Sequence, residues 1–173
     1  MAKWYMLTVV GTDRTGMVAG LTKTLFEHDC NLGEASMARL GDSFTMMMMV
    51  RSPHDETHMR DWLGPLTQSL KLHYHLDAID GHLHRHLEPN VRISVFGADR
   101  AGIVAQVTGA MAAAGLHVVH LETNVAGTDA RPIYVMHIEG IANQGVDALR
   151  AAAKELATAG VDIGIEDIDT LIG

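Results

Sequence analysis

The stretch Gly11-Thr12-Asp13-Arg14-Thr15-Gly16 returns later in the chain as Gly97-Ala98-Asp99-Arg100-Ala101-Gly102, at an offset of 86 residues. That offset is very nearly half of the 173-residue sequence. The residues that follow each motif repeat at the same offset, so that Val18, Thr22 and Leu25 correspond to Val104, Thr108 and Met111. A period of this length is too long for a solenoid of small repeats and is typical of two tandem small domains.

The composition is that of a globular protein with a packed core. Hydrophobic residues make up 47% of the chain and charged residues 20%, which excludes global disorder. The longest apolar run, residues 46–50, is far shorter than the roughly 20 residues that span a bilayer, and the N-terminus lacks a targeting pattern. We therefore expect an untargeted cytoplasmic protein with no membrane partner. The net charge of −8 argues against direct DNA binding.

Both repeats begin with the same two predicted elements. Strands with one buried face are predicted where apolar residues alternate with others, at Tyr5, Leu7 and Val9 and again at Val91, Ile93 and Val95. Helices with an apolar stripe are predicted after each glycine motif, with stripe residues Val18, Leu21 and Leu25, then Val104, Val107 and Met111.

Two further strands are predicted after each of these helices. In the first repeat they cover residues 31–40 and 43–50, and Gly41-Asp42 between them predicts a hairpin. In the second repeat the equivalent strands, 117–125 and 133–139, flank a longer predicted loop at residues 126–132. Cys30, which lies just before the first of these strands, is predicted to be a small buried residue.

A second helix and a last strand complete each repeat. Ser52 as the cap and Pro53 in the first turn predict the start of the helix in the first repeat. The apolar stripes of the two helices are Met59, Leu63, Leu66 and Leu70, then Val146, Leu149, Ala153 and Leu156. The last strands are predicted at residues 71–78 and at Val161, Ile163 and Ile165.

The order of elements is therefore β-α-β-β-α-β in both halves. This order predicts an α+β protein of two tandem ferredoxin-like domains, each with an antiparallel sheet and both helices on one face. We place the first domain at residues 1–80, a linker at 81–88 and the second domain at 89–173.

Four consecutive methionines occupy residues 46–49. Strand alternation directs Met46 and Met48 to the core, and Met47 and Met49 to the opposite face of the sheet. A sheet with a second apolar face needs cover, which suggests packing against another subunit. We therefore expect a homodimer or a higher oligomer.

The repeated unit resembles the ACT domain, a small amino-acid-binding regulatory module. The element order and the Asp-Arg-x-Gly motif between the first strand and the first helix of each unit carry this resemblance. The tandem pair, which fills nearly the whole chain, resembles the glycine cleavage system transcriptional repressor family. That resemblance implies a sensor of a small amino acid, with glycine and serine as candidates, which regulates transcription of amino-acid metabolism genes through a partner protein.

The chemistry of the motif suits an α-amino acid. Gly16 and Gly102 allow a ligand to approach the backbone N–H groups at a helix start, and such groups bind a carboxylate. Asp13 and Asp99 can accept hydrogen bonds from an ammonium group. The predicted ligand-binding residues of the motif are Asp13, Arg14 and Gly16 in the first copy, and Asp99, Arg100 and Gly102 in the second.

The family resemblance adds one more residue to each predicted site. In amino-acid-binding ACT domains a second polar residue lies at the start of the second strand, 18 residues after the acidic position of the motif. That position holds Asn31 in the first copy and His117 in the second. Asn31 matches the family's habit, whereas His117 departs from it. Structural roles explain the motif equally, because Asp13 and Asp99 can cap helices and the glycines can serve turn geometry alone.

Eleven histidines raise the hypothesis of a metal site. His73 and His75 alternate on a predicted strand, and His82, His84 and His86 alternate through the linker. No cysteine or acidic partner occurs at a fixed spacing, so a polar linker and exposed strand positions explain these histidines equally well.

No nucleophile elbow, Walker loop or dinucleotide fingerprint occurs in the sequence. We therefore predict a non-catalytic regulatory protein without cofactor or metal, which binds a small amino acid and signals to a protein partner. The alternatives are a ligand-independent interaction scaffold built from ACT-like units, and a metal-dependent enzyme that uses the histidines.

Overall fold

A computed structural model of the chain describes residues 2–80, 87–98, 101–128, 131–158 and 160–168. The chain divides into two compact units, Met1–His84 and Arg85–Gly173, here called unit 1 and unit 2. The predicted linker at residues 81–88 lies largely outside the described residues, and the predicted domain boundaries remain a prediction.

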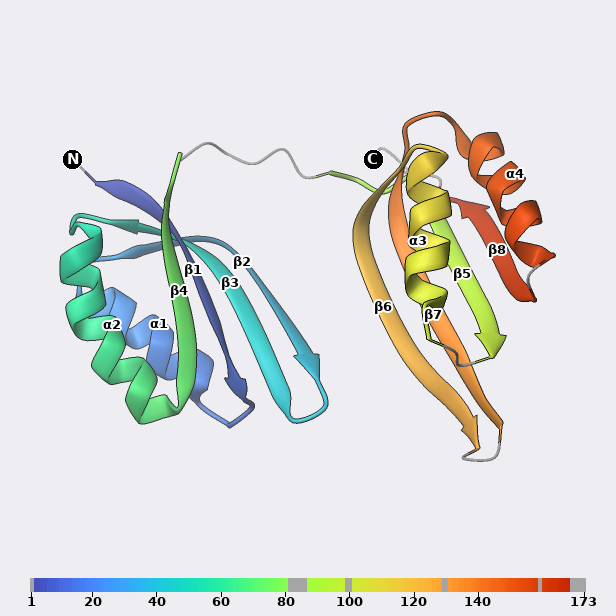
Figure 1. The fold of residues 1–173 in the computed structure, drawn as a ribbon. Coiled ribbons are helices and arrows are strands. Elements are labelled where there is room, and N and C mark those ends of the chain that lie inside the picture. Colours follow the sequence, from blue (N-terminus) through green and yellow to red (C-terminus); the bar gives the residue numbers. More distant parts are fainter. Residues whose placement is uncertain (1, 81–86, 99–100, 129–130, 159, 169–173) are drawn as a thin grey trace. The chain divides into compact units, whose positions relative to one another are not determined.

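Unit 1 consists of one four-stranded antiparallel sheet and two helices (Figure 1). Its elements are β1 (Lys3–Thr12), α1 (Met17–Glu27), β2 (Asn31–Leu40), β3 (Ser43–Ser52), α2 (Glu56–Leu70) and β4 (Leu72–Ile79). The strand order is β2-β3-β1-β4. Residues of both helices pack with the inward side chains of the strands in one core, which includes Leu7, Met48, Leu21 and Leu63.

Unit 2 repeats this architecture with its own core. Its elements are β5 (Val91–Ala98), α3 (Ile103–Ala113), β6 (Leu116–Thr128), β7 (Arg131–Ala142), α4 (Val146–Ala157) and β8 (Val161–Asp167). The strand order is β6-β7-β5-β8. The prediction of two tandem ferredoxin-like βαββαβ domains is confirmed.

The apolar stripes of α1 and α3 begin one residue earlier than the sequence predicted. Met17 and Ile103 are the first buried residues, whereas Val18 is 39% exposed and Val104 is only partly buried. Gly16 and its counterpart in unit 2 precede these helices in the left-handed conformation. That turn directs the first helical side chain to the core.

The predicted role of Ser52 is wrong, because β3 continues as far as this residue and α2 is capped by Asp55. The Asp55 carboxylate accepts a hydrogen bond from the backbone N–H of His58 at 2.9 Å. The buried Ser52 hydroxyl instead accepts hydrogen bonds from the His54 N–H at 3.0 Å and from the Cys30 thiol at 3.3 Å. Cys30 is buried as predicted, and its burial raises the pKa of the thiol.

The predicted loop at residues 126–132 is also wrong. Strand β6 continues to Thr128 and pairs there with Arg131, the first residue of β7. Pro132 interrupts no backbone hydrogen bond with β5, because β5 ends at Ala98 and Ala98 pairs with Ile133, the residue after the proline. A proline is tolerated beyond the end of a neighbouring strand because its missing N–H leaves no partner unbonded.

The methionines at residues 46–49 alternate between the two sheet faces as predicted, but the two on the face away from the helices differ in exposure. Met46 and Met48 lie in the core, and Met47 on the opposite face is 48% exposed. Met49 on that opposite face is only 7% exposed. A Cβ atom at Gly33 would lie 2.9 Å from the Trp4 ring and 3.3 Å from Met49 Cβ, so both side chains pack over this glycine. Unit 1 therefore covers Met49 itself.

Gly140 on β7 tests the close packing in unit 2. A Cβ atom there would collide with the backbone oxygen of His117, beside the bulge of β6. We expect Gly140→Ala to lower the free energy of unfolding by about 1–3 kcal/mol, measured by differential scanning calorimetry. Gly109→Ala in α3, where a Cβ atom meets nothing within 4 Å, is the control and should stabilise by about 0.5–1 kcal/mol. Unchanged stability of Gly140→Ala would contradict this packing.

The cap of α2 carries a pH dependence. The Asp55 carboxylate, 2.9 Å from His58 Nδ1, raises the pKa of His58 above its usual 6.5 by a side-chain hydrogen bond, and bonding from His58 lowers the pKa of Asp55 below its usual 3.8. The contribution of His58 to stability is therefore full below pH 6.5 and is lost as pH rises through its raised pKa. That of Asp55 is present above pH 3.8 and is lost as pH falls through its lowered pKa.

We expect the NMR titration of the His58 ring to have a midpoint above 6.5 in the native protein. Asp55→Asn, which keeps a good capping residue but removes the charge, should bring that midpoint back towards 6.5. An identical midpoint in the two proteins would show that the pair does not form in solution.

Candidate functional site

The start of α1 has the features of a position that can accept an anion. Gly16 is the N-cap residue with φ 90° and ψ −1°, and within the described part of the chain no side chain caps this helix. The first N–H groups of an α-helix lack partners within the helix and carry a partial positive charge. A Cβ atom at Gly16 would meet nothing within 4 Å, so the space beside the turn is open to a ligand.

Asp13 faces the β2–β3 hairpin and does not cap α1. Its Oδ2 atom lies 3.1 Å from Arg39 Nε, and its backbone N–H donates to the Asp42 carbonyl at 2.8 Å. The capping alternative for Asp13 is therefore not what the structure shows. Arg14, the next residue of the motif, is exposed.

Sequence reasoning missed Arg39 and Asp42. The signal that points to them is the hairpin register, in which Thr12 at the end of β1 pairs with Ser43 and Ser43 pairs with Leu40. This register places the turn that ends β2 beside the motif that follows β1. Neither the spacing nor the chemistry of the motif alone identifies a partner 26 residues away.

A shallow, mostly apolar hollow of about 210 Å³ adjoins the ion pair of Asp13 and Arg39. Arg39 contributes to both features, because it lines the hollow and contacts Asp13. The residues that line the hollow are Val10, Ala38, Arg39, Leu40, Ser43, Phe44 and Thr45. This end of unit 1 thus combines a carboxylate, a guanidinium group, free helix N–H groups and an apolar surface.

Asn31 lies at the opposite end of the sheet. It pairs with Arg51, which pairs with Trp4 near the start of β1. Nine residue steps along β2 separate Asn31 from Leu40, and at about 3.3 Å per step this is about 30 Å. Within one unit the structure does not bring Asn31 and Asp13 together.

The second predicted site is described only in part. Gly102 precedes α3 with φ 87°, as Gly16 precedes α1. Asp99 and Arg100 lie outside the described residues. His117 is exposed near the start of β6 and pairs with Ile141, whereas Ala126, nine residues further along β6, pairs with Ile133 beside the end of β5. His117 therefore lies at the sheet end remote from the turn at Gly102.

The predicted histidine sets do not form a metal centre in what the structure describes. His73 and His75 are exposed on β4, and His75 Nε2 lies 3.0 Å from Asp77 Oδ2. No group of three or more His, Cys, Asp or Glu side chains among the described residues is arranged to hold a metal ion. His82, His84 and His86 fall outside these residues. In the same described ranges, none of the helices has the length and apolarity needed to cross a membrane.

One family profile and several relatives match the sequence. The profile described as "ACT domain" matches residues 5–77. The UPF0237 protein of Streptococcus pneumoniae serotype 4 is 35% identical over 69 residues, which cover 39% of this chain and 78% of that protein. The UPF0237 protein YjhC of Lactococcus lactis is 43% identical over 51 residues, 30% of this chain and 59% of that protein. The UPF0237 protein MK1213 of Methanopyrus kandleri is 44% identical over 45 residues, 26% of this chain and 50% of that protein.

The chain thus spans only 50–59% of the length of these last two relatives. Two solved structures share its fold over 97% of this chain and 99% of their own. One is an unknown protein from Galdieria sulphuraria, with a TM-score of 0.75 and 22% identity. The other, named as a proposed glycine cleavage system transcriptional repressor, has a TM-score of 0.70 and 19% identity. The profile match and the pneumococcal relative, together with the duplicated fold, show that this chain belongs to the ACT domain family.

Proposed function

We propose that this chain is a non-catalytic regulatory protein that binds a small α-amino acid and signals to a protein partner. The observation that carries the proposal is the meeting of Asp13, Arg39 and the uncapped start of α1 at one end of unit 1. An α-amino acid presents one carboxylate and one ammonium group, which are the complements of these groups.

The ligand can enter this arrangement at little cost. The side chains of Arg39 and Asp13 are 60% and 37% exposed, and an exposed ion pair contributes only about 0–1 kcal/mol. A bound ammonium group can therefore share the Asp13 carboxylate while the ligand carboxylate takes the N–H groups of α1 or the Arg39 guanidinium. Glycine and serine are the first ligands to test.

Asn31 completes this site when it comes from a second copy of the chain. All ten residues of the edge strand β2 are exposed, including Leu32, Met37 and Leu40. A long apolar edge strand is a template for pairing with another strand. Antiparallel pairing of two β2 edges sets the start of one strand beside the end of the other. Asn31 of one copy then approaches Asp13 and Arg39 of the second, and we propose a homodimer on this basis.

A role in transcription is a proposal that the fold relative supports. That relative is named as a proposed glycine cleavage system repressor, and it is similar to this chain in fold at 19% identity. The net charge of −8 disfavours contact with DNA phosphates, so regulation through a partner protein is the form we propose. The ligand-independent scaffold is the second candidate, and the exposed β2 edge favours it independently of any amino acid.

Calorimetric titration tests the ligand-binding residues. After a thermal-shift screen over the standard amino acids identifies a ligand, Asp13→Ala and Asn31→Ala should each weaken binding by roughly ten-fold or more, because each loses a hydrogen bond to a charged group of the ligand. His117→Ala should have a smaller effect at neutral pH. Asp77→Ala, an exposed acid on β4, is the control and should bind normally. No stabilisation by any amino acid, with dimers present in light scattering, would favour the scaffold.

Mixing the two weak variants tests whether each site uses two copies. In a symmetric dimer, a heterodimer of Asp13→Ala and Asn31→Ala chains carries both changes in one site and neither change in the other. An equimolar mixture should therefore recover about a quarter of the native binding capacity at native affinity, measured by titration after subunit exchange. A mixture that binds no better than its two components would show that Asp13 and Asn31 do not meet across a dimer.

A further inference from the structure

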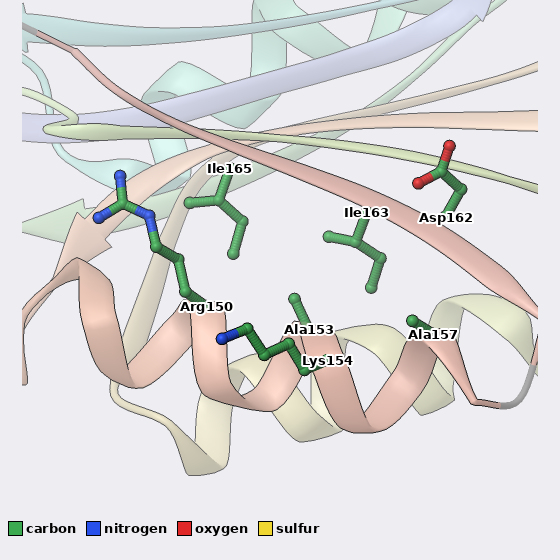
Figure 2. A pocket seen from close by; sticks show the side chains of 7 residues that line it. All are labelled: Arg150, Ala153, Lys154, Ala157, Asp162, Ile163 and Ile165. Carbon is green, nitrogen blue, oxygen red and sulfur yellow. The ribbon is translucent and has the colours of Figure 1, made fainter.

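A hollow of about 290 Å³ lies between α4 and β8 in unit 2 (Figure 2). Its floor is apolar and is formed by Ala153 and Ala157 of α4 with Ile163 and Ile165 of β8, while the charged residues Arg150, Lys154 and Asp162 also line it. Figure 2 shows the two isoleucine side chains directed towards the helix, with the Asp162 carboxylate on the other side of the strand. The hollow therefore opens along the helix-facing side of β8.

Comparison with unit 1 explains why this space is open. The equivalent positions in unit 1 hold Leu63, which is buried in the core, and Tyr74, which packs against it. The guanidinium carbon of Arg60 lies over the Tyr74 ring at 6.0 Å from its centroid. Unit 2 has the smaller residues Ala153 and Ile163 at these two positions, so less side-chain volume fills the space between helix and strand.

The strand that borders the hollow is also an open sheet edge. Strand β8 is the last in the order β6-β7-β5-β8, and no described strand pairs with its outer side. The backbone N–H of Ile168 donates to the Asn90 carbonyl at 2.9 Å. Because backbone groups alternate along a strand, those of residues 163 and 165 point to the outer edge. Ile163 and Ile165 thus offer side chains to the hollow and backbone groups to an incoming strand.

In unit 1 an arginine side chain binds the edge carbonyl that is equivalent to that of Ile165. In unit 2 the equivalent arginine has other partners. Arg60 donates from Nη2 to the Leu76 carbonyl at 3.0 Å, and Leu76 pairs with β1 as Ile165 pairs with β5. Arg150, which corresponds to Arg60, instead binds the carboxylates of Asp167 at 2.8 Å and Asp147 at 3.1 Å. The Arg150 guanidinium group thus binds two carboxylates, whereas that of Arg60 binds the Glu56 carboxylate and the edge carbonyl of Leu76.

The charges on β8 indicate which strand fits this edge. Asp162 and Glu166 are exposed on the face away from α4, with Gly164 between them. If a second copy paired antiparallel about Gly164, Asp162 of each copy would face Glu166 of the other. Like charges directly opposite one another destabilise a strand pair, so self-pairing in this register is disfavoured. Basic residues opposite these two acids are favoured instead.

We propose that the β8 edge and the adjoining hollow bind an extended segment of a partner protein in which apolar residues alternate with basic residues. The segment adds a strand to the sheet, its apolar side chains enter the hollow beside Ala153, and its basic side chains face Asp162 and Glu166. Addition of a strand with side-chain pockets is an established mode of peptide recognition. This site is separate from the end of unit 1 that holds Asp13 and does not depend on amino-acid binding.

The probe is a capped peptide of roughly six residues that alternates lysine and leucine, added to the full-length protein. We expect it to shift the NMR amide resonances of β8 and α4, and to bind at least about ten-fold more tightly than the matched peptide with glutamate in place of lysine. Ala153→Leu introduces the residue type of the equivalent position in unit 1 and fills part of the hollow. It should weaken peptide binding at least about five-fold. Asp162→Lys with Glu166→Lys should weaken it further.

One control variant and one substitute variant separate an effect on peptide binding from an effect on folding. Asp77→Lys makes on β4 the charge change that Glu166→Lys makes on β8, at an edge that Arg60 covers, and should leave peptide affinity unchanged. Ala157→Leu narrows the hollow from an exposed position and replaces Ala153→Leu if that variant loses its thermal transition. Equal affinity for the two peptides, or native affinity in the filled variants, would overturn the proposal. So would movement of the β8 resonances on dilution without peptide, which would assign the edge to a second copy.

Discussion

The length of β2 is the constraint that governs how this protein can bind a ligand. The strand has ten residues, with Asn31 at its start and Arg39, the ion-pair partner of Asp13, near its end. At about 3.3 Å per residue, Asn31 and the Asp13–Arg39 pair are about 26 Å apart along β2. An α-amino acid is far shorter than this distance. If both ends of β2 contribute to one site, that site must be assembled from two copies of the chain. The exposed β2 edge supplies a surface on which the copies can associate.

The fold was predictable from the sequence because its signals are local. Strand alternation, helical spacing and the glycine motif occur twice, and each predicts the same order of elements. The predictions of single residues were wrong where two neighbouring residues suit the same role by sequence and tertiary packing decides between them. Ser52 resembles a helix cap, but its hydroxyl is used by Cys30 and His54, and Asp55 caps α2 instead. Met17 replaces Val18 in the core because the turn at Gly16 sets the phase of the helix.

The candidate site was less predictable because its decisive contact is not local. The motif identifies Asp13, but its partner Arg39 is fixed by the register of β1, β3 and β2. The two copies also diverged on the surface while they kept one fold. On the sheet face away from the helices, unit 1 pairs Met6 with Met49, whereas the equivalent pair in unit 2 is an ion pair between Arg92 and Glu139 at 2.8 Å. The two copies therefore share the core pattern and differ on this surface.

Sedimentation velocity with and without the amino acid identified by screening measures whether the ligand binds between two copies, because such a ligand must strengthen their association. We expect saturating amino acid to shift the monomer–dimer equilibrium of the native protein towards dimer. We expect Asn31→Ala to abolish this shift. Full-affinity binding of the amino acid to the monomer, with no change in the dimer dissociation constant, would rule out a site shared between two copies.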